Sequence, residues 1–360
     1  VLASGAEPLS YNRDIRPILS ENCFACHGPD SGTREAKLRL DVREAALEKE
    51  ALVPGDLEAS ELIYRIVTDD EDDLMPPPDS HKVLTAEQKQ TLKDWVLQGA
   101  PYEAHWAYLK PVRPEVPAAG AKHPIDNFVR ARLGPEKLAL SAPATSPTLN
   151  RRLAFDLTGL PPSWFGIAPD TKASDAIETL LASPHFGERM AVFWLDLARY
   201  ADTAGYHSDK ERDVTPYRDY VINAFNRNKP YDAFVMEQLA GDLFDNPTVD
   251  NYVATAFNRV NQISEEGGIQ DAEYIAKYYA ERVRTTGVAF LGATMGCAEC
   301  HDHKFYPITM KDFYAMQAFF ADIYEKGAYN GDGRYTEGAD IKNYPGMRLD
   351  KWGPAIDVPE

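Results

Sequence analysis

Apolar residues recur at helical spacing along most of the chain, whereas the alternation of period two that is typical of strands is scarce. Near the N-terminus, the segment YNRDIRPILSENCFACHG places Ile15, Ile18 and Leu19 on one face of a short amphipathic helix. SELIYRIV predicts a second helix. LTAEQKQTLKDWVLQGA predicts a third, which begins with a capping box formed by Thr85 and Gln88.

The longest helical patterns lie in the larger, C-terminal part of the chain. They are IDNFVRARL, SDAIETLLAS, ERMAVFWLDLARYA, YRDYVINAFN, YDAFVMEQLAGDLF, AEYIAKYYAERVRTTGVAFLGA and KDFYAMQAFFADIYE. Each has apolar residues three and four positions apart, which is the spacing of a buried helix face. The chain is therefore predicted to be mainly α.

Breaks in these patterns suggest where domains begin and end. Residues 106–124 contain KPVRPEVPAAGAKHP, with four prolines, and are expected to form an extended, semi-rigid linker. Residues 327–360 are rich in glycine, proline and charge and are expected to be a loop or linker. This leaves a small N-terminal domain over residues 1–105 and a larger helical domain over residues 125–326.

Composition and charge limit the classes of partner. The 360 residues are 44% hydrophobic and 26% charged, which is ordinary for a soluble globular protein. The net charge is 38 − 56 = −18, which disfavours nucleic acid and favours a basic partner. No apolar run is long enough for a transmembrane helix. The N-terminal VLASGAEPLS fits an exported protein whose signal has been removed, and equally a cytosolic one.

The four cysteines carry the clearest chemical signal. They form two Cys-x-x-Cys-His motifs, with thiols at Cys23, Cys26, Cys297 and Cys300 and histidines at His27 and His301. This is the attachment motif of c-type haem, in which the histidine becomes an axial ligand of the iron. A zinc site would need further cysteines or histidines at finger spacing, and a redox disulfide needs no histidine directly after it. We therefore expect two covalently bound haems.

A second axial ligand for the first haem is expected at Met75. It precedes three consecutive prolines, which would hold the loop and aim the thioether at the iron. His81, in the same loop, is the alternative. A methionine and histidine pair would give this haem a high reduction potential.

The second haem offers several candidate ligands. Two of them, His303 and Met295, are too near the motif in sequence to reach the opposite face of the same haem. His207 lies in the polar turn TAGYHSDKERD between two helices and is our prediction. Met310 and a vacant position are the alternatives, and a vacant position would permit small-ligand binding or peroxide chemistry.

With these residues in view, the chain resembles the planctomycete-type cytochrome c family over about residues 10–326. The resemblance rests on RPILSENCFACHGPD, VPGDLEASELIYRI, LMPPPDSHKVL, FGERMAVFWLDLARYADTAGYH and ERVRTTGVAFLGATMGCAECHDHKFYPIT. It implies export to a periplasmic or similarly oxidising compartment, and a further C-terminal domain that this chain lacks. The Met75 loop matches the family's Met-Pro-Pro element. His207 matches a histidine of some members, where others carry glutamate.

Together these features predict a class I-like cytochrome c domain followed by a larger helical haem-c domain. The expected function is electron transfer between the two haems and a redox partner protein. The alternatives are a haem enzyme, either peroxidase-like or an oxidoreductase subunit, and a ligand sensor with an open site at the second haem. No nucleophile and base are spaced for catalysis, so no catalytic residue is expected.

Overall fold

The computed structural model describes residues 8–206, 209, 211–264, 270–321 and 323, and the segment 327–360 lies outside them. Helices joined by loops make up the described residues, within which two isolated β-bridges form and no sheet does. The prediction of a mainly α protein is confirmed. None of the described helices is long and apolar enough to cross a membrane.

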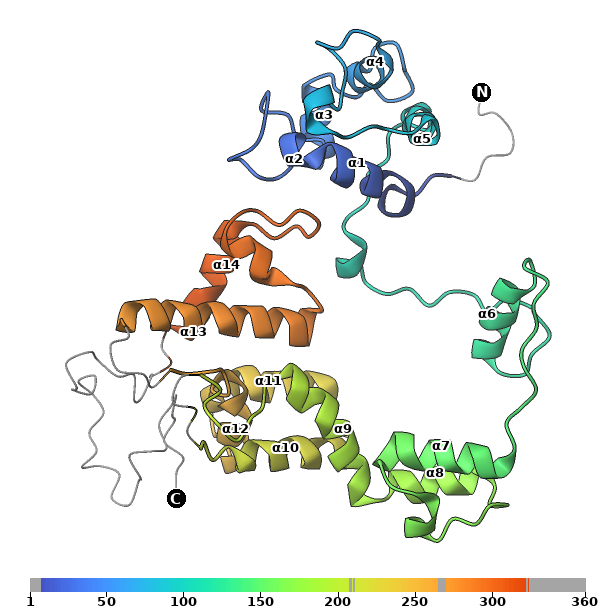
Figure 1. Cartoon of the computed structure of the whole chain (residues 1–360), viewed down its shortest axis with the longest axis vertical. Helices are drawn as coiled ribbons and strands as arrows, with labels where there is room; N and C mark the ends of the chain where they lie inside the picture. Colours follow the sequence, from blue (N-terminus) through green and yellow to red (C-terminus); the bar gives the residue numbers. More distant parts are fainter. Residues whose placement is uncertain (1–7, 207–208, 210, 265–269, 322, 324–360) are drawn as a thin grey trace. The chain divides into compact units, whose positions relative to one another are not determined.

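The described residues divide into two compact units. Figure 1 colours their helices by position along the chain. The first unit joins residues up to 112 with residues 293–316, and the second holds residues 113–292 and those from 317 onward. The second Cys-x-x-Cys-His motif is therefore part of the same compact unit as the first, although most of the chain separates them in sequence.

The first unit is built from short helices. They are η1 (Tyr11–Ile15), α1 (Arg16–Asn22), α2 (Phe24–His27), α3 (Arg43–Glu48), α4 (Glu61–Val67), η2 (Pro78–Ser80), α5 (Ala86–Leu97), η3 (Trp106–Tyr108), η8 (Met295–Glu299) and α14 (Met310–Gln317), whose last residue falls in the second unit. The expected capping box begins α5, where the Gln88 amide donates to Thr85 Oγ1 over 3.1 Å and the Thr85 amide donates to Gln88 Oε1 over 2.9 Å.

The core of the first unit is aromatic at its centre. Trp95 of α5 is fully buried and packs against the stacked rings of Tyr11 and Tyr102, whose centroids lie 6.0 and 5.3 Å from its own. Its indole N–H donates to the carbonyl of Pro101 over 2.9 Å, so the one polar atom of the ring is satisfied. Ile15 and Leu19, from the predicted apolar face, are buried in the same cluster.

The second unit holds the longer helices. They are α6 (Pro124–Leu133), α7 (Ser146–Thr158), η4 (Pro162–Phe165), α8 (Ala173–Leu181), α9 (Pro184–Leu197), α10 (Thr215–Asn226), α11 (Tyr231–Ala240), η5 (Gly241–Leu243), α12 (Val249–Ala254), η6 (Thr255–Asn258), α13 (Asp271–Thr286), η7 (Gly287–Leu291) and η9 (Ala318–Phe320). The sequence patterns did not predict α7, although Pro147 in its first turn and Gly159 after its end, with φ of +74°, are standard boundary residues.

Helices α9 and α10 pack closely because Gly187 has no side chain. A Cβ atom there would lie 2.4 Å from the carbonyl oxygen of Ile222. Deeper in the unit, the indole of Trp194 and the hydroxyl of Tyr217 both donate to the buried side-chain oxygen of Gln238, over 2.9 and 2.7 Å. A buried polar network of this kind favours a single packing arrangement, since each lost partner would leave an unpaired group.

Candidate functional site

The first Cys-x-x-Cys-His motif lies where α1 ends and α2 begins. The amides of Cys26 and His27 both donate to the carbonyl of Cys23, over 3.1 and 2.8 Å. Residues three and four positions apart on such a turn lie on the same face. The turn therefore directs both thiols and the imidazole of His27 to the wall of a single cavity.

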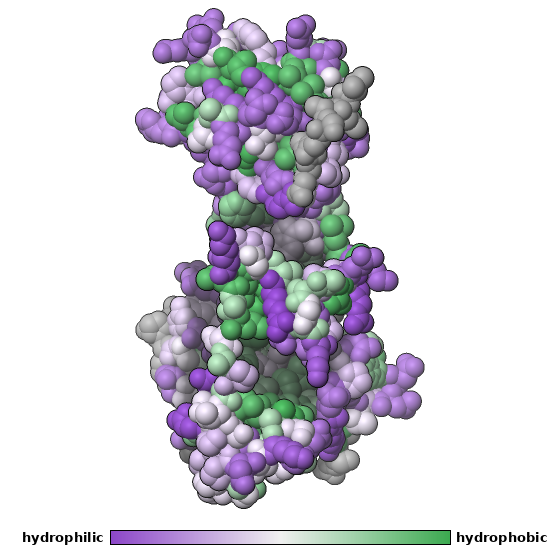
Figure 2. All heavy atoms as spheres, turned by 90° about the vertical axis from the view of Figure 1, so that its right-hand side faces the viewer, coloured by the Kyte–Doolittle hydropathy of each residue, from purple (hydrophilic) through white to green (hydrophobic). Residues whose placement is uncertain are grey.

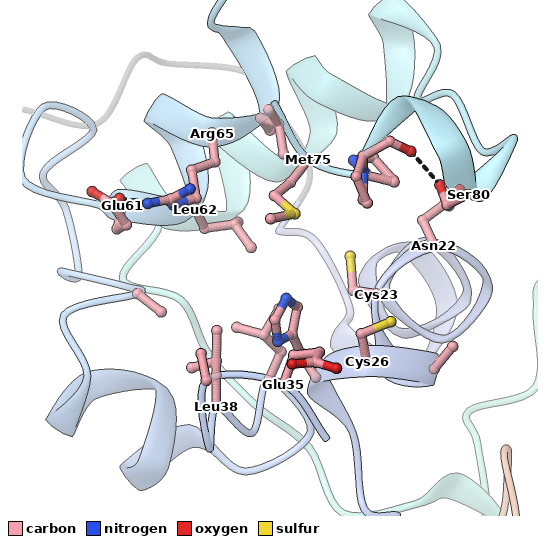
Figure 3. Close-up of a pocket in the computed structure, with 18 of the residues that line it drawn as sticks. Asn22, Cys23, Cys26, Glu35, Leu38, Glu61, Leu62, Arg65, Met75 and Ser80 are labelled. Carbon is pink, nitrogen blue, oxygen red and sulfur yellow. Dashed lines mark hydrogen bonds and ion pairs between the residues drawn. The ribbon is translucent and has the colours of Figure 1, made fainter. Parts of the chain in front are cut away.

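This cavity has a volume of about 490 Å³, within the range of cofactor pockets. Figure 3 shows the thiols of Cys23 and Cys26 on one side of it and the side chains of Leu62 and Arg65, from α4, on another. Most of the lining is apolar. The aliphatic and proline members are Ala25, Ala36, Leu38, Leu40, Ala51, Leu62, Ile66, Pro76 and Pro77.

Met75 reaches the same cavity from the proline-rich loop. Its thioether is directed inward in Figure 3, from a different element than the two thiols. The loop is held by its backbone, because the Met75 amide donates to the carbonyl of Arg65 over 2.9 Å and Pro76 is buried. His81, the alternative ligand, is exposed and does not line the cavity. The structure thus brings Met75, but not His81, to the cavity that holds His27.

The donor set of this cavity fits a covalently attached haem. Nδ1 of His27 is buried and has no hydrogen-bond partner, so this nitrogen is left for a group that the cavity would bind. Burial lowers the pKa of His27, which favours the neutral ring that binds a metal. Burial also raises the pKa of the Cys23 thiol to about 12, with Lys82 opposing the shift. Cys23 and Cys26 would hold the haem, and His27 and Met75 would ligate its iron, which supplies one-electron transfer.

The second motif repeats the same local turn, which begins in η8 and continues past its end. The amides of Cys300 and His301 both approach the carbonyl of Cys297, at 3.4 Å, and all three side chains are exposed. His301 Nδ1 lies 2.9 Å from the carbonyl oxygen of Asp302. A carbonyl only accepts, so Nδ1 carries the proton and the lone pair is on Nε2. Metal-binding histidines have this tautomer and this kind of partner, so His301 also suits an axial ligand.

The ligand opposite His301 remains a prediction. His207 lies outside the described residues. Met295 is buried in the first unit, and Met310 is 42% exposed at the start of α14. His303 has another role, since its Nδ1 accepts hydrogen bonds from the amides of Phe305 and Tyr306, both at 3.0 Å.

The sequence patterns did not predict the cavity wall that faces the first Cys-x-x-Cys-His motif. Leu62 and Ile66 line the cavity and are four residues apart in SELIYRIV, so the helical spacing could have marked them as one face. No comparable signal marks Leu38 and Leu40, which lie in a loop. Nor does any mark Arg16, which contacts the segment after the second motif.

Comparison with known proteins agrees with this geometry. A family model described as planctomycete cytochrome C (PSCyt1) matches residues 23–79, from the first thiol into the Met75 loop. A second model, PSCyt2, described as a protein of unknown function (DUF1549), matches residues 124–325, more than half of the chain. The chain belongs to the planctomycete-type cytochrome c family. No curated protein and no solved structure matches it.

Membership of this family implies covalently bound haem c. The PSCyt1 match contains both thiols of the first motif, His27 and Met75, and so covers most of the cavity. Within the described part of the chain, no group of three or more histidine, cysteine or acidic side chains is arranged as a separate metal site. The PSCyt2 match contains the second motif, whose role the family description leaves open.

Proposed function

We propose that the protein is a dihaem c-type cytochrome that transfers electrons between its two haems and a redox partner protein. The observation that carries this proposal is the cavity in which two thiols, His27 and Met75 converge. A covalently held haem with two strong axial ligands cycles between oxidation states without dissociating, which suits electron transfer rather than substrate binding.

The second haem would be held by Cys297 and Cys300, with His301 as one axial ligand. The repeated local turn and the hydrogen bond from His301 Nδ1 to a carbonyl support this assignment. His207 is the ligand we propose on its opposite face. In this proposal the first haem belongs to the cytochrome domain predicted over residues 1–105. The second belongs to the end of the helical domain predicted over residues 125–326, of which residues 293–316 pack in the first compact unit.

The partner proposed is a basic protein in an oxidising compartment such as the periplasm, where c-type haem is attached. The net charge of −18 supports a basic partner. On the face visible in Figure 2, hydrophilic side chains are interspersed with smaller hydrophobic areas. Near the cavity, five consecutive acidic residues, Asp69–Asp73, precede the Met75 loop and would attract a basic surface to this edge.

Intact mass after expression with haem-attachment machinery tests the haem content. The wild-type chain should carry two haems, and the variants C23A/C26A and C297A/C300A should each carry one. An unmodified polypeptide mass would refute the proposal. A single haem that only C23A/C26A removes would leave a monohaem cytochrome, and the second motif would then need another explanation.

The exposure of Cys297, Cys300 and His301 favours one alternative, an open site at the second haem that serves an enzyme or a ligand sensor. The absorption spectrum of the reduced protein with and without carbon monoxide distinguishes the two functions. An unchanged spectrum means that both irons hold two strong protein ligands. A shift of about half the haem absorbance means that one position is open.

A further inference from the structure

The segment that follows the second motif, residues 302–308 (DHKFYPI), forms a closed loop, which we call the junction loop. Its centre is His303, which is 3% exposed and accepts the amides of Phe305 and Tyr306. The His303 amide donates to the carbonyl of Ile308 over 2.9 Å, and the Asp302 carboxylate accepts the Met310 amide over 2.7 Å. The loop is therefore held in one shape by its own hydrogen bonds.

The junction loop contacts the helix that leads into the first motif. Arg16 of α1 donates to the carbonyl of Phe305 over 2.5 Å, across 289 residues of sequence. Lys304 forms an ion pair with Glu21 of the same helix over 3.2 Å. These contacts come from the two ends of α1, so the loop lies along the helix.

A third contact comes from the segment after α5. The ring of His105 lies 5.4 Å from that of Tyr306, which in turn lies 4.7 Å from the ring of His303. The His105 Nδ1 accepts the amide of Ala107 over 3.2 Å, which fixes the orientation of the ring against the loop. The junction loop is thus held by α1 and by residues beside η3, all within the first compact unit.

These contacts join the two motifs by short stretches of chain. Glu21 precedes Cys23 by two residues, and Lys304 follows His301 by three. At a maximal reach of about 3.5 Å per residue, these stretches span at most about 7 and 10 Å on either side of the ion pair. The ion pair and the bond from Arg16 therefore connect the two attachment motifs through only a few residues of chain.

We propose that the junction loop is the positioning element for electron exchange between the two haem-binding motifs, with Arg16 and Glu21 as its anchors. This inference rests on the proposed function, since it requires that both motifs carry haem. The step is the transfer of one electron, in which one iron is oxidised while the other is reduced and no bond breaks. The chain's part is to keep the second motif in place beside the first.

The experiment uses the full haem-loaded chain and the variant R16Q/E21K, which removes both anchors. The control is R130Q/E273K in the second unit, which removes an arginine bond to the carbonyl of Gly120 and the exposed pair of Glu273 with Lys277. Intact mass first establishes two haems in each protein. Hydrogen exchange at the Phe305 and Tyr306 amides then reports loop closure, and flash photoreduction by one electron per molecule reports re-equilibration between the haems.

In R16Q/E21K we expect the two amides to exchange about tenfold faster or more, the loss appropriate to a charge-assisted hydrogen bond. Electron re-equilibration should slow in proportion to the fraction of molecules with the loop closed. The control should match the wild type in both measurements. The charge swap E21K/K304E should restore the slow amide exchange and the fast electron re-equilibration that E21K alone loses. It provides the test if R16Q/E21K does not fold.

Two results would overturn the proposal while leaving the proposed function intact. One is amide exchange that R16Q/E21K does not change. The other is amide exchange that shows the loop open in most molecules of R16Q/E21K, with electron re-equilibration that remains within about twofold of the wild type, since the closed population then does not limit the step. If the intact mass shows fewer than two haems in the wild type, the dihaem function itself fails. The mass reports haem content alone, so this failure is distinguishable from a failure of the junction-loop proposal.

Discussion

Replacing Met75 by leucine should remove an iron ligand without removing a wall of the cavity. Met75 is half-buried, and its loop is held by the hydrogen bond from its amide to Arg65 and by a 3.4 Å contact from Arg65 Nη1 to the Asp73 carbonyl. Leucine leaves these backbone contacts in place and nearly conserves volume. Exchanges of this kind cost less than about 1.5 kcal/mol, so the variant should fold.

The thioether, in contrast, has no replacement in leucine. Loss of a methionine ligand should lower the reduction potential of the first haem and open its sixth position to carbon monoxide. We expect a decrease larger than about 59 mV, which is a tenfold change in the preference for the reduced state of a one-electron couple.

The assay is a redox titration followed by absorption, in the C297A/C300A background so that a single haem reports. H81Q is the matched control, since His81 lies in the same loop but is exposed and outside the cavity lining. It should change neither the potential nor the response to carbon monoxide. The assignment of Met75 would be wrong if M75L kept both properties of the parent, and it would pass to His81 if H81Q lost them.

Three further predictions concern packing, pH and salt. G187A should destabilise the second unit by about 1–3 kcal/mol, because its Cβ would meet the Ile222 carbonyl; an unchanged urea midpoint would contradict the close approach of α9 and α10. Burial, with Arg16 and His303, lowers the pKa of His105 below 6.5, while the Phe305 backbone opposes the shift. As the pH falls, His105 therefore binds a proton in the unfolded chain at a higher pH than in the folded chain. The contribution of the neutral His105 to the free energy of unfolding is complete above about pH 6.5 and decreases below that pH. In H105Q, the urea midpoint should change less with pH between about pH 7.5 and 5.5 than it does in the wild type. Equal slopes of midpoint against pH in the two proteins would contradict this role of His105. Association with a basic partner should slow as ionic strength rises, and neutralising Asp69–Asp73 should reduce that dependence; rates insensitive to salt would exclude electrostatic steering.

Features that depend on residues close together in the chain could be predicted from the sequence alone. A Cys-x-x-Cys-His motif needs only one turn of chain, and both motifs form such a turn, with amides three and four residues on directed at the carbonyl of the first cysteine. The capping box of Thr85 and Gln88 and the helices of period 3.6 likewise depend on residues a few positions apart. Patterns that span only a few residues can be recognised in a single sequence, because residues that are close along the chain are also close in space.

Contacts between residues far apart in the chain could be found only in the folded structure. Leu38, from a loop, and Leu62, from α4, line the cavity together because the first unit packs them there, and no local pattern relates their positions. The bond from Arg16 to Phe305 crosses 289 residues, and it brings the second motif into the unit that holds the first. Such contacts depend on the packing of the whole unit. Their residues carry no periodicity of their own, and the chain has to fold before the partners are defined.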